Sequence, residues 1–250
     1  MNRRARLSVF GLGAAGLAVL FALALAGMPD FGTSDHPYRD LAVPAAVAHD
    51  TANVVSSVNF DQRALDTLGE EVILLSAVVG ATALLRPTPH ETQRPPAPGG
   101  RVLDGTILMA YLLLPLTTLI GLDVVVHGHL TPGGGFQGGV VLATALHLLY
   151  LAGRYESLAR LRPLDWYVWV EGSSAASFAG IGLVGLGLGS GFLANVAPHG
   201  SFQNLLSAGT VPILNVVTGG AVAGGAVVLL AQFLNQALGT TPQAAQKSAG

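Results

Sequence analysis

Hydrophobic residues in this chain gather in six long runs that are apolar on every side, with shorter polar segments between them. The runs cover residues 7–28, 65–85, 102–126, 136–155, 166–190 and 211–238. A helix needs ~20 apolar residues to cross a hydrocarbon core of ~30 Å. The strict alternation typical of strands is absent, and a backbone in lipid must satisfy its own hydrogen bonds. The pattern predicts an all-α, polytopic membrane protein with about six transmembrane helices, two followed by four.

Composition supports a membrane protein. Hydrophobic residues make up 51% of the chain and charged residues 10%, whereas soluble domains contain about 25% charged residues. The net charge is −2 and no run is rich in Lys or Arg, so we expect no nucleic-acid partner. The chain has no cysteine, which excludes disulfides and thiolate metal sites.

The first apolar run allows two interpretations. MNRRAR followed by an apolar stretch and ALAG resembles a signal peptide with a cleavage site at Ala24–Ala26. The run is nevertheless 22 residues long, whereas signal cores have about 7–15. We therefore expect a retained transmembrane helix.

The distribution of Lys and Arg predicts the orientation. With the N-terminus inside and six spans alternating, ten basic residues lie inside and only two, Arg39 and Arg63, lie outside. Basic residues favour the cytoplasmic side, so we expect a multi-pass protein of the cell membrane with both termini in the cytoplasm. The outer segment 29–61 contains Val47, Val54, Val55 and Val58, which could form one apolar stripe of a helix on the outer surface.

The segment RPTPHETQRPPAPGGR, residues 86–101, is rich in proline and divides the chain. We expect an N-terminal two-helix unit over residues 1–86, whose outer segment covers residues 29–64. A cytoplasmic linker over residues 87–101 follows. A four-helix domain then covers residues 102–238, and a cytoplasmic tail covers residues 239–250.

Two apolar runs meet at HGHLTPGGGFQGG, residues 127–139. The apolar stretch 139–152 would extend only ~21 Å as a helix, too short to cross a membrane. The helix should therefore start near residues 133–136, which draws the glycines to membrane depth. Glycines there would let another helix or an ion approach the backbone. The alternative is an outer turn with Pro132 at a helix start. The motif consists of Pro132, Gly133, Gly134, Gly135, Phe136, Gly138 and Gly139.

Ionisable residues inside or beside the apolar runs are candidates for an ion path, because burying them in a membrane is costly. They are Glu70, Asp66, Asp123, His127, His129, His147 and Glu171. Each has a structural alternative. Thr67 and Glu70 also have the spacing of a capping box, and Asp66 could likewise cap that helix. Asp123 and His127 share a helix face as a relay or an interfacial pair.

Other ionisable residues are assigned by position. His129 lies in the Gly–Pro turn, and His147 is either a hydrogen-bonded core histidine or a relay. Glu171 follows an aromatic belt, and we interpret Glu71 as interfacial. No third ligand follows the two histidines at useful spacing, so we expect no metal site and no cofactor. Motifs of soluble enzymes are absent from the sequence, so we expect no enzymatic activity.

Three stretches carry a resemblance to known families. GLDVVVHGHLTPGGGFQGGVVLATALHLLYLAG, residues 121–153, resembles the MnhB-type subunit of multisubunit Mrp-type cation/proton antiporters, and GTVPILNVVTGGAVAGG, residues 209–225, resembles its last helix. NVVSSVNFDQRALDTLGEEVILLSAVVGATALLRP, residues 53–87, is similar to the C-terminal tail of the large A-type antiporter subunit, and to the small E-type subunit of membrane-bound hydrogenases. This chain departs from them by an extra residue between Phe60 and Arg63, and by the fusion itself.

The resemblance implies a membrane subunit of a sodium(cation)/proton antiporter that contributes to the cation or proton path and to assembly. Implied partners are other membrane subunits of the A, C, D, E, F and G types, with sodium and protons as transported ions in a lipid bilayer. It also implies that the acid at Glu70 takes part in ion movement. One alternative is a homologous subunit of an ion-pumping hydrogenase, another oxidoreductase or an inorganic-carbon uptake complex. Another is a scaffold subunit without an ion path.

Overall fold

The computed structural model describes residues 3–28, 32, 34, 36–86, 102–161 and 163–236, and these contain helices but no strand. The helices are α1 Arg3–Ala26, α2 Pro37–Ala48, α3 Val54–Ser57, the π-helical turn η1 Val58–Gln62, α4 Ala64–Leu84, α5 Asp104–Val126, α6 Gly135–Leu151, α7 Tyr155–Leu161, α8 Leu164–Gly187 and α9 Val211–Gln236. The predicted all-α fold is confirmed.

Six helices correspond to the six predicted runs. Four of them, α1, α4, α5 and α9, are long and apolar enough to cross a membrane, and α6 is a shorter apolar helix. Helix α8 is 24 residues long but carries Asp165 and Glu171. Helix α6 ends at Leu151, four residues before the predicted end, because Gly153 adopts the left-handed φ of 66° and α7 begins at Tyr155.

The chain divides into two units, Met1–Leu41 and Ala42–Gly250. The first contains α1, which has no buried residue. The second contains the other long helices, and in it α4 packs against both α9 and α8. The predicted domain boundary at the proline-rich segment lies outside the described residues and stays a prediction.

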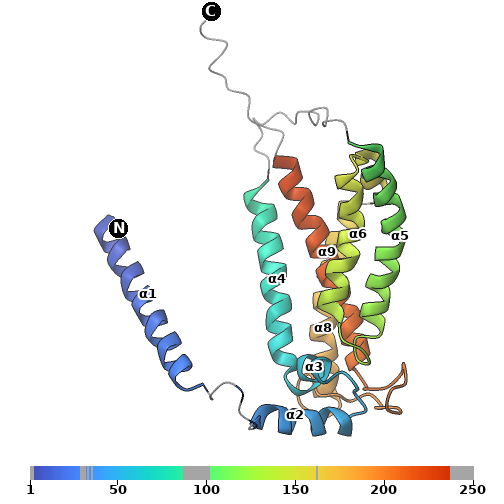
Figure 1. Cartoon of the computed structure of the whole chain (residues 1–250). Helices are drawn as coiled ribbons and strands as arrows, with labels where there is room; N and C mark the ends of the chain where they lie inside the picture. The colour runs from blue at the N-terminus through green and yellow to red at the C-terminus, as the bar shows by residue number, and fades with distance from the viewer. Residues whose placement is uncertain are drawn as a thin grey trace, which may run out of the picture. The chain divides into compact units, whose positions relative to one another are not determined.

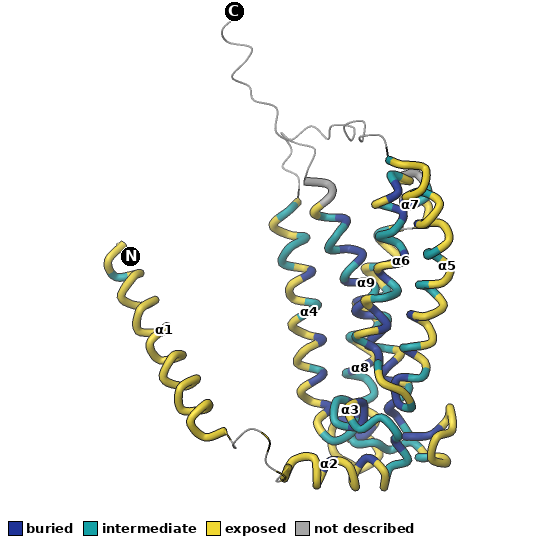
Figure 2. Tube along the Cα trace, in the orientation of Figure 1, coloured by how far each residue is buried: buried dark blue, intermediate teal, exposed yellow. Residues whose placement is uncertain are grey.

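Helix α9 is the centre of the second unit, because it packs against each of α4, α5, α6 and α8. Within the span of α9, 56% of the residues are buried, against 17% for α4 and for α5. Figure 2 shows the same concentration of buried residues along α9. Any polar side chain that faces α9 is therefore removed from lipid.

The connections of this unit alternate between two ends (Figure 1). Helices α2 and α3 and the loops 127–134 and 188–210 lie at one end, which we call the α3 end. Helix α7 lies at the opposite end, the α7 end. Within this unit, the helices follow the up-and-down order that alternating membrane spans require.

Glycines bring the helices around α9 into close contact. A Cβ atom added at Gly139 of α6 would lie 2.8 Å from the carbonyl oxygen of Gly219, and one at Gly224 would lie 2.9 Å from that of Tyr167 on α8. A Cβ at Gly138 would lie 2.8 Å from the carbonyl oxygen of Gly121 on α5. Only residues without a side chain permit such an approach, as is usual where helices pack in membranes.

The segment before α4 differs from the prediction. Val47 lies in α2, whereas Val54 and Val55 lie in α3 and Val58 begins η1. Asp50 adopts a φ of 54°, and Asn53 starts α3 as its N-cap. The prediction of one continuous apolar stripe was wrong, because the chain reverses between the two helices.

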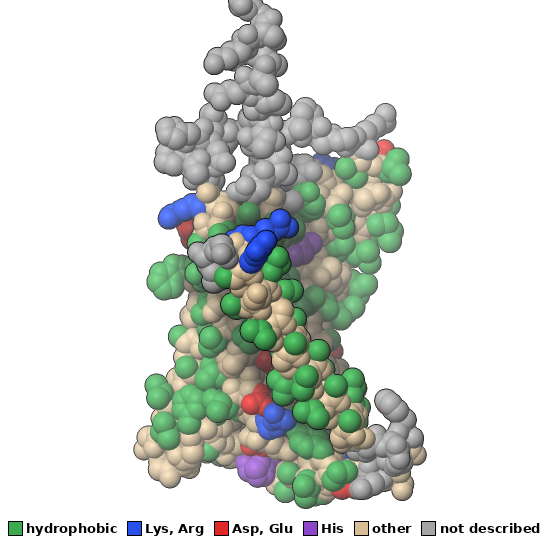
Figure 3. Space-filling view, turned by 90° about the vertical axis from the view of Figure 1, so that its left-hand side faces the viewer, with side chains coloured by type: hydrophobic (Ala, Val, Ile, Leu, Met, Phe, Trp, Pro, Cys, Tyr) green, Lys and Arg blue, Asp and Glu red, His purple; other side chains and the backbone are tan. Residues whose placement is uncertain are grey.

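Hydrophobic side chains cover most of the described face in Figure 3. Large apolar residues are more than half exposed on several helices, among them Leu65 and Ile73 of α4 and Leu108 of α5. A soluble monomer rarely exposes so large an apolar area. This surface is suited to lipid and to other membrane subunits.

The α6–α9 contact generates a first prediction. A methyl group at Gly135 would clash with the carbonyl oxygen of Asn215 and lie 2.7 Å from Cβ of Thr218. We expect Gly135→Ala to destabilise the protein by about 1–3 kcal/mol through overpacking. Thermal unfolding of the purified protein measures this.

The matched control is Gly180→Ala in α8, where an added Cβ has no atom within 4 Å. Alanine favours a helix over glycine by about 1 kcal/mol, so this variant should be as stable as the native protein or slightly more so. Equal behaviour of the two variants would contradict the close contact at Gly135.

Candidate functional site

Buried polar side chains collect around α9 and at the α3 end. They are Thr51, Ser56, Ser57, Thr67, Glu71, His129, Glu171, Ser207, Thr210, Asn215 and Thr218. Polar groups in the membrane interior are costly and usually mark ion or substrate paths. Their hydrogen bonds therefore show which of them are structural and which have unused capacity.

Asn215 joins three segments at the α3 end. Its Oδ1 accepts a hydrogen bond of 2.9 Å from the backbone N–H of Gly135, the first residue of α6. Its Nδ2 donates to Oγ of Ser56 at 2.8 Å and to the carbonyl of Val211 at 3.1 Å. The amide thus satisfies a free N–H at the start of α6 and ties α3 to α9.

Asn53 holds the HGHLTPGGG loop against α3. Its Nδ2 donates to the carbonyls of Gly128, at 2.7 Å, and Thr131, at 2.8 Å. Its backbone N–H donates to the carbonyl of His129 at 2.9 Å. Its Oδ1 accepts from the N–H groups of Val55 and Ser56 as the N-cap of α3.

The loop is both a turn and a close contact. Gly133 and Gly134 have φ values of 138° and 141°, which L side chains rarely adopt. Helix α6 begins at Gly135, as the length argument predicted. Pro132 is exposed and lies before that helix, so the alternative that placed it at the helix start was wrong. Phe136 is half-buried at the first turn of α6.

Two adjacent acids on α4 have opposite environments. Glu70 is exposed, whereas Glu71 is only 1% exposed and lies beside Thr218 of α9. Neither Glu71 Oε1 nor Thr218 Oγ1 has a hydrogen-bond partner in the described part of the chain. Our interpretation of Glu71 as interfacial was wrong. The buried positions of α4, which include Thr67, Glu71 and Val78, follow a helical spacing that could have indicated its direction.

The capping alternative for Glu70 was also wrong. Helix α4 begins at Ala64 with Arg63 as its N-cap, so Thr67 lies inside the helix. The Thr67 hydroxyl donates to the carbonyl of Asn59 at 2.6 Å. Asp66 is exposed and forms an ion pair with Arg63.

Glu171 of α8 is the second buried acid. It is 3% exposed, and its Oε1 has no hydrogen-bond partner among the described residues. A Cβ added at Gly225 of α9 would lie 2.9 Å from that oxygen. A cavity of about 310 Å³ adjoins Glu171. It lies between α4, α8 and α9 and is lined by Val78, Val79, Thr82, Ala83, Arg86, Val168, Glu171 and Val228.

The remaining predicted candidates lie apart from these acids. Asp123 Oδ1 and His127 Nδ1 are 2.9 Å apart on one helix face, as their spacing predicted, with side chains 70% and 38% exposed. His147 is half-buried in α6. His129 is fully buried, and burial lowers the pKa of its imidazole below the ordinary 6.5.

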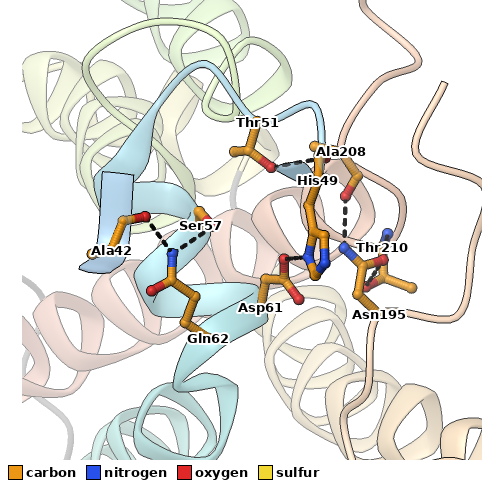
Figure 4. A network of polar contacts seen from close by, with 9 residues as sticks. All are labelled: Ala42, His49, Thr51, Ser57, Asp61, Gln62, Asn195, Ala208 and Thr210. Atoms are coloured by element: carbon orange, nitrogen blue, oxygen red, sulfur yellow. Dashed lines mark hydrogen bonds and ion pairs between the residues drawn. The ribbon is translucent and has the colours of Figure 1, made fainter. Parts of the chain in front are cut away.

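A second polar cluster at the α3 end was not predicted (Figure 4). His49 Nδ1 and Asp61 Oδ2 are 2.5 Å apart, and the His49 ring stacks on that of His199 with centroids 4.4 Å apart. Gln62 Nε2 donates to the carbonyl of Ala42 and to Oγ of Ser57. These contacts join segments distant in sequence, so no local pattern could indicate them.

Fold and site together define a polytopic subunit of a membrane complex, with buried acids around a central helix. Residues 106–228 match a family described as "Domain related to MnhB subunit of Na+/H+ antiporter". The chain belongs to this family of MnhB-like membrane subunits of Mrp-type complexes.

Two sequence relatives support this assignment. An uncharacterized protein of Methanocaldococcus jannaschii is 30% identical over 67% of this chain and 71% of its own length. A probable K(+)/H(+) antiporter protein of the A/B type from Rhizobium meliloti (strain 1021) is 26% identical over 79% of this chain, which spans only 22% of that longer protein.

Two solved structures resemble the fold. A chain of the membrane-bound sulfane sulfur reductase, an archaeal respiratory membrane complex, has a TM-score of 0.69 and 28% identity, with 94% of this chain and 99% of that chain covered. A chain of the Mrp complex from Dietzia sp. DQ12-45-1b has a TM-score of 0.66 and 26% identity, with 93% and 26% covered. Both neighbours belong to membrane complexes, as the recognised family implies.

The buried imidazole of His129 generates a second prediction. Its lowered pKa means that the folded state takes up this proton at lower pH than the unfolded state does. As pH falls below about 6.5, the unfolded state binds more protons and the free energy of unfolding decreases. We expect His129→Gln to reduce this loss, measured as unfolding temperature between pH 7.5 and 5.

His36→Gln is the control, because His36 is exposed. It should leave the pH dependence of unfolding at the native slope. An unchanged slope in His129→Gln would show that the imidazole is not held neutral by burial.

Proposed function

We propose that this chain carries part of an ion path in a multisubunit cation/proton antiporter and is not itself an enzyme. The observation that supports the proposal is the pair of buried acids, Glu71 and Glu171, whose unbonded oxygens face the central helix α9. Such groups exchange protons or bind cations, which is the chemistry that the family description implies.

A scaffold without an ion path explains these acids poorly. A carboxyl group in an apolar interior without a compensating hydrogen bond costs several kcal/mol. Leucine or alanine at the same positions would pack without that cost. The cavity beside Glu171 also provides an approach to one of the acids, which a sealed scaffold does not need.

Orientation and partners belong to the same proposal. The α3 end lies outside and the α7 end lies in the cytoplasm, with both termini cytoplasmic in the cell membrane, because this places ten basic residues inside and two outside. Other subunits of the A, C, D, E, F and G types cover the exposed apolar faces. Sodium or another cation and protons are the transported ions.

Glu70 keeps a separate place in the proposal. It is exposed on α4, away from α9. An ionised side chain facing hydrocarbon is unfavourable, so we propose that a partner subunit covers this face and that Glu70 acts at that contact. Its part in ion movement rests on the resemblance of the DTLGE segment alone.

A second candidate function is a subunit of a redox-driven ion pump. The chain corresponds to 99% of the matched chain of the sulfane sulfur reductase, but to 26% of the matched chain of the Mrp complex. A separate chain of this length therefore suits a respiratory complex. Purifying the native complex would distinguish the two, because only the second contains subunits with redox centres.

The acids generate a third prediction. Glu71→Gln and Glu171→Gln each remove the charge and keep the shape, so the complex should assemble while cation/proton exchange falls about 100-fold or more, the range for loss of a general acid or base. Exchange is measured in proteoliposomes that contain the whole complex. Asp165→Asn, an exposed acid in the first turn of α8, is the matched control and should retain exchange.

Full exchange by both glutamine variants, with assembly verified by subunit composition, would favour the scaffold alternative. Loss of assembly in either variant is resolved by Glu171→Asp, which keeps the acid with a shorter side chain. This variant should restore part of the exchange.

Topology generates a fourth prediction. The absence of native cysteine makes single-cysteine labelling unambiguous. A cysteine at Ser201, in the exposed loop 188–210, should react with an impermeant maleimide added to intact cells. A cysteine at Ser157 of α7 should react only after permeabilisation, and the reverse pattern would invert the proposed orientation.

A further inference from the structure

The two buried acids lie at different depths of the membrane unit. Glu71 is seven residues beyond the start of α4, so it lies about 10 Å from the α3 end at ~1.5 Å per residue. Glu171 is seven residues beyond the start of α8, and so lies about 10 Å from the α7 end. Each acid is therefore nearer to a different side of the membrane.

Each acid also has polar surroundings that lead toward its own end. From the α3 end, Gln62 bonds Ser57, and the adjacent Ser56 bonds Asn215. Thr218 follows Asn215 by three residues on the same helix and lies beside Glu71. From the α7 end, the cavity reaches from the exposed Arg86 to Glu171.

Val78 lies between these two halves. It is the next buried residue of α4 after Glu71, two helical turns away and about 10 Å along the axis. Val78 is 2% exposed, lines the cavity that adjoins Glu171, and lies 3.2 Å from a Cβ added at Gly225. Its apolar side chain therefore ends the cavity on the side toward Glu71.

The half nearer the α3 end is too closely packed for a metal cation. A Cβ added at Gly128 would lie 2.5 Å from Asn215 Oδ1, and that oxygen already accepts the Gly135 N–H. A dehydrated cation requires several free oxygen ligands around one point. Hydroxyl and carboxyl groups instead transfer protons without needing such space.

We propose that the ion conducted between Glu71 and Glu171 is a proton, and that Val78 is the apolar barrier separating a proton site open to the α3 end from one open to the α7 end. This proposal rests on the proposed function. In each transfer, the carboxylic acid of one glutamate loses a proton, which passes through water at the Val78 layer, and the carboxylate of the other gains it. An intact barrier couples this step to changes in the rest of the complex and prevents a free leak.

The test adds one hydroxyl group to the barrier. Val78→Thr keeps the shape of the side chain and offers a hydrogen-bonding site for water. The whole complex is reconstituted in liposomes that contain a pH-sensitive dye, in choline buffer without sodium or potassium, with a permeant anion to dissipate charge. We expect a proton leak about tenfold above wild type, the change produced by lowering a barrier by about 1.4 kcal/mol.

Two further variants identify the route of the leak. Val72→Thr makes the same change on the exposed face of α4, where Val72 is 51% exposed, and should leak no more than wild type. The double variant Val78→Thr/Glu171→Gln should also return to the wild-type level, because the leak requires the proton site at Glu171. A leak that persists in the double variant would overturn the proposal.

Cation flux separates a proton barrier from a cation barrier. Efflux of radioactive sodium from the same liposomes should be unchanged by Val78→Thr, and an increase would show that the path carries the cation. No leak of either ion would overturn the assignment of Val78 as the barrier. The function proposed above fails separately, when the single variants Glu71→Gln and Glu171→Gln retain full exchange.

Discussion

The hydrogen bond between Asn215 and the backbone N–H of Gly135 is the interaction on which the rest of this structure depends. The first N–H groups of a helix lack partners within it, and α6 is too short to place its start in water. Asn215 supplies the missing acceptor from α9, and glycines allow the two helices to approach closely enough for the bond. The same amide holds Ser56, so α3, α6 and α9 are positioned together.

The position of α9 has consequences for chemistry. Because four other helices cover α9, the side chains that face it are shielded from lipid. Acids on α4 and α8 that point toward it are buried in protein, where neighbouring groups and enclosed water control their protonation. A central helix with small residues thus provides both the packing and the space in which two carboxyl groups can face each other from different depths.

Much of the fold was predictable from local pattern. The starts of α4, α5, α6, α8 and α9 lie within two residues of the predicted runs, because apolar length and glycine or polar breaks determine where a helix can enter a membrane. The outer segment was predicted less well. Its reversal depends on Asp50 and on the capping of α3 by Asn53, and Asn53 is held in turn by carbonyls about 75 residues away.

The sequence by itself determined the class of protein, the number of long helices and the start of α6, since these follow from hydropathy and chain geometry. The tertiary structure alone decided which acid faces the interior. Glu70 and Glu71 are adjacent in an apolar run that shows little amphipathic contrast, because lipid and protein interior are equally apolar. Only the contact of α4 with α9 buries Glu71 and leaves Glu70 exposed. For the same reason, the cluster of His49, Asp61 and His199 became visible only when three distant segments were brought together.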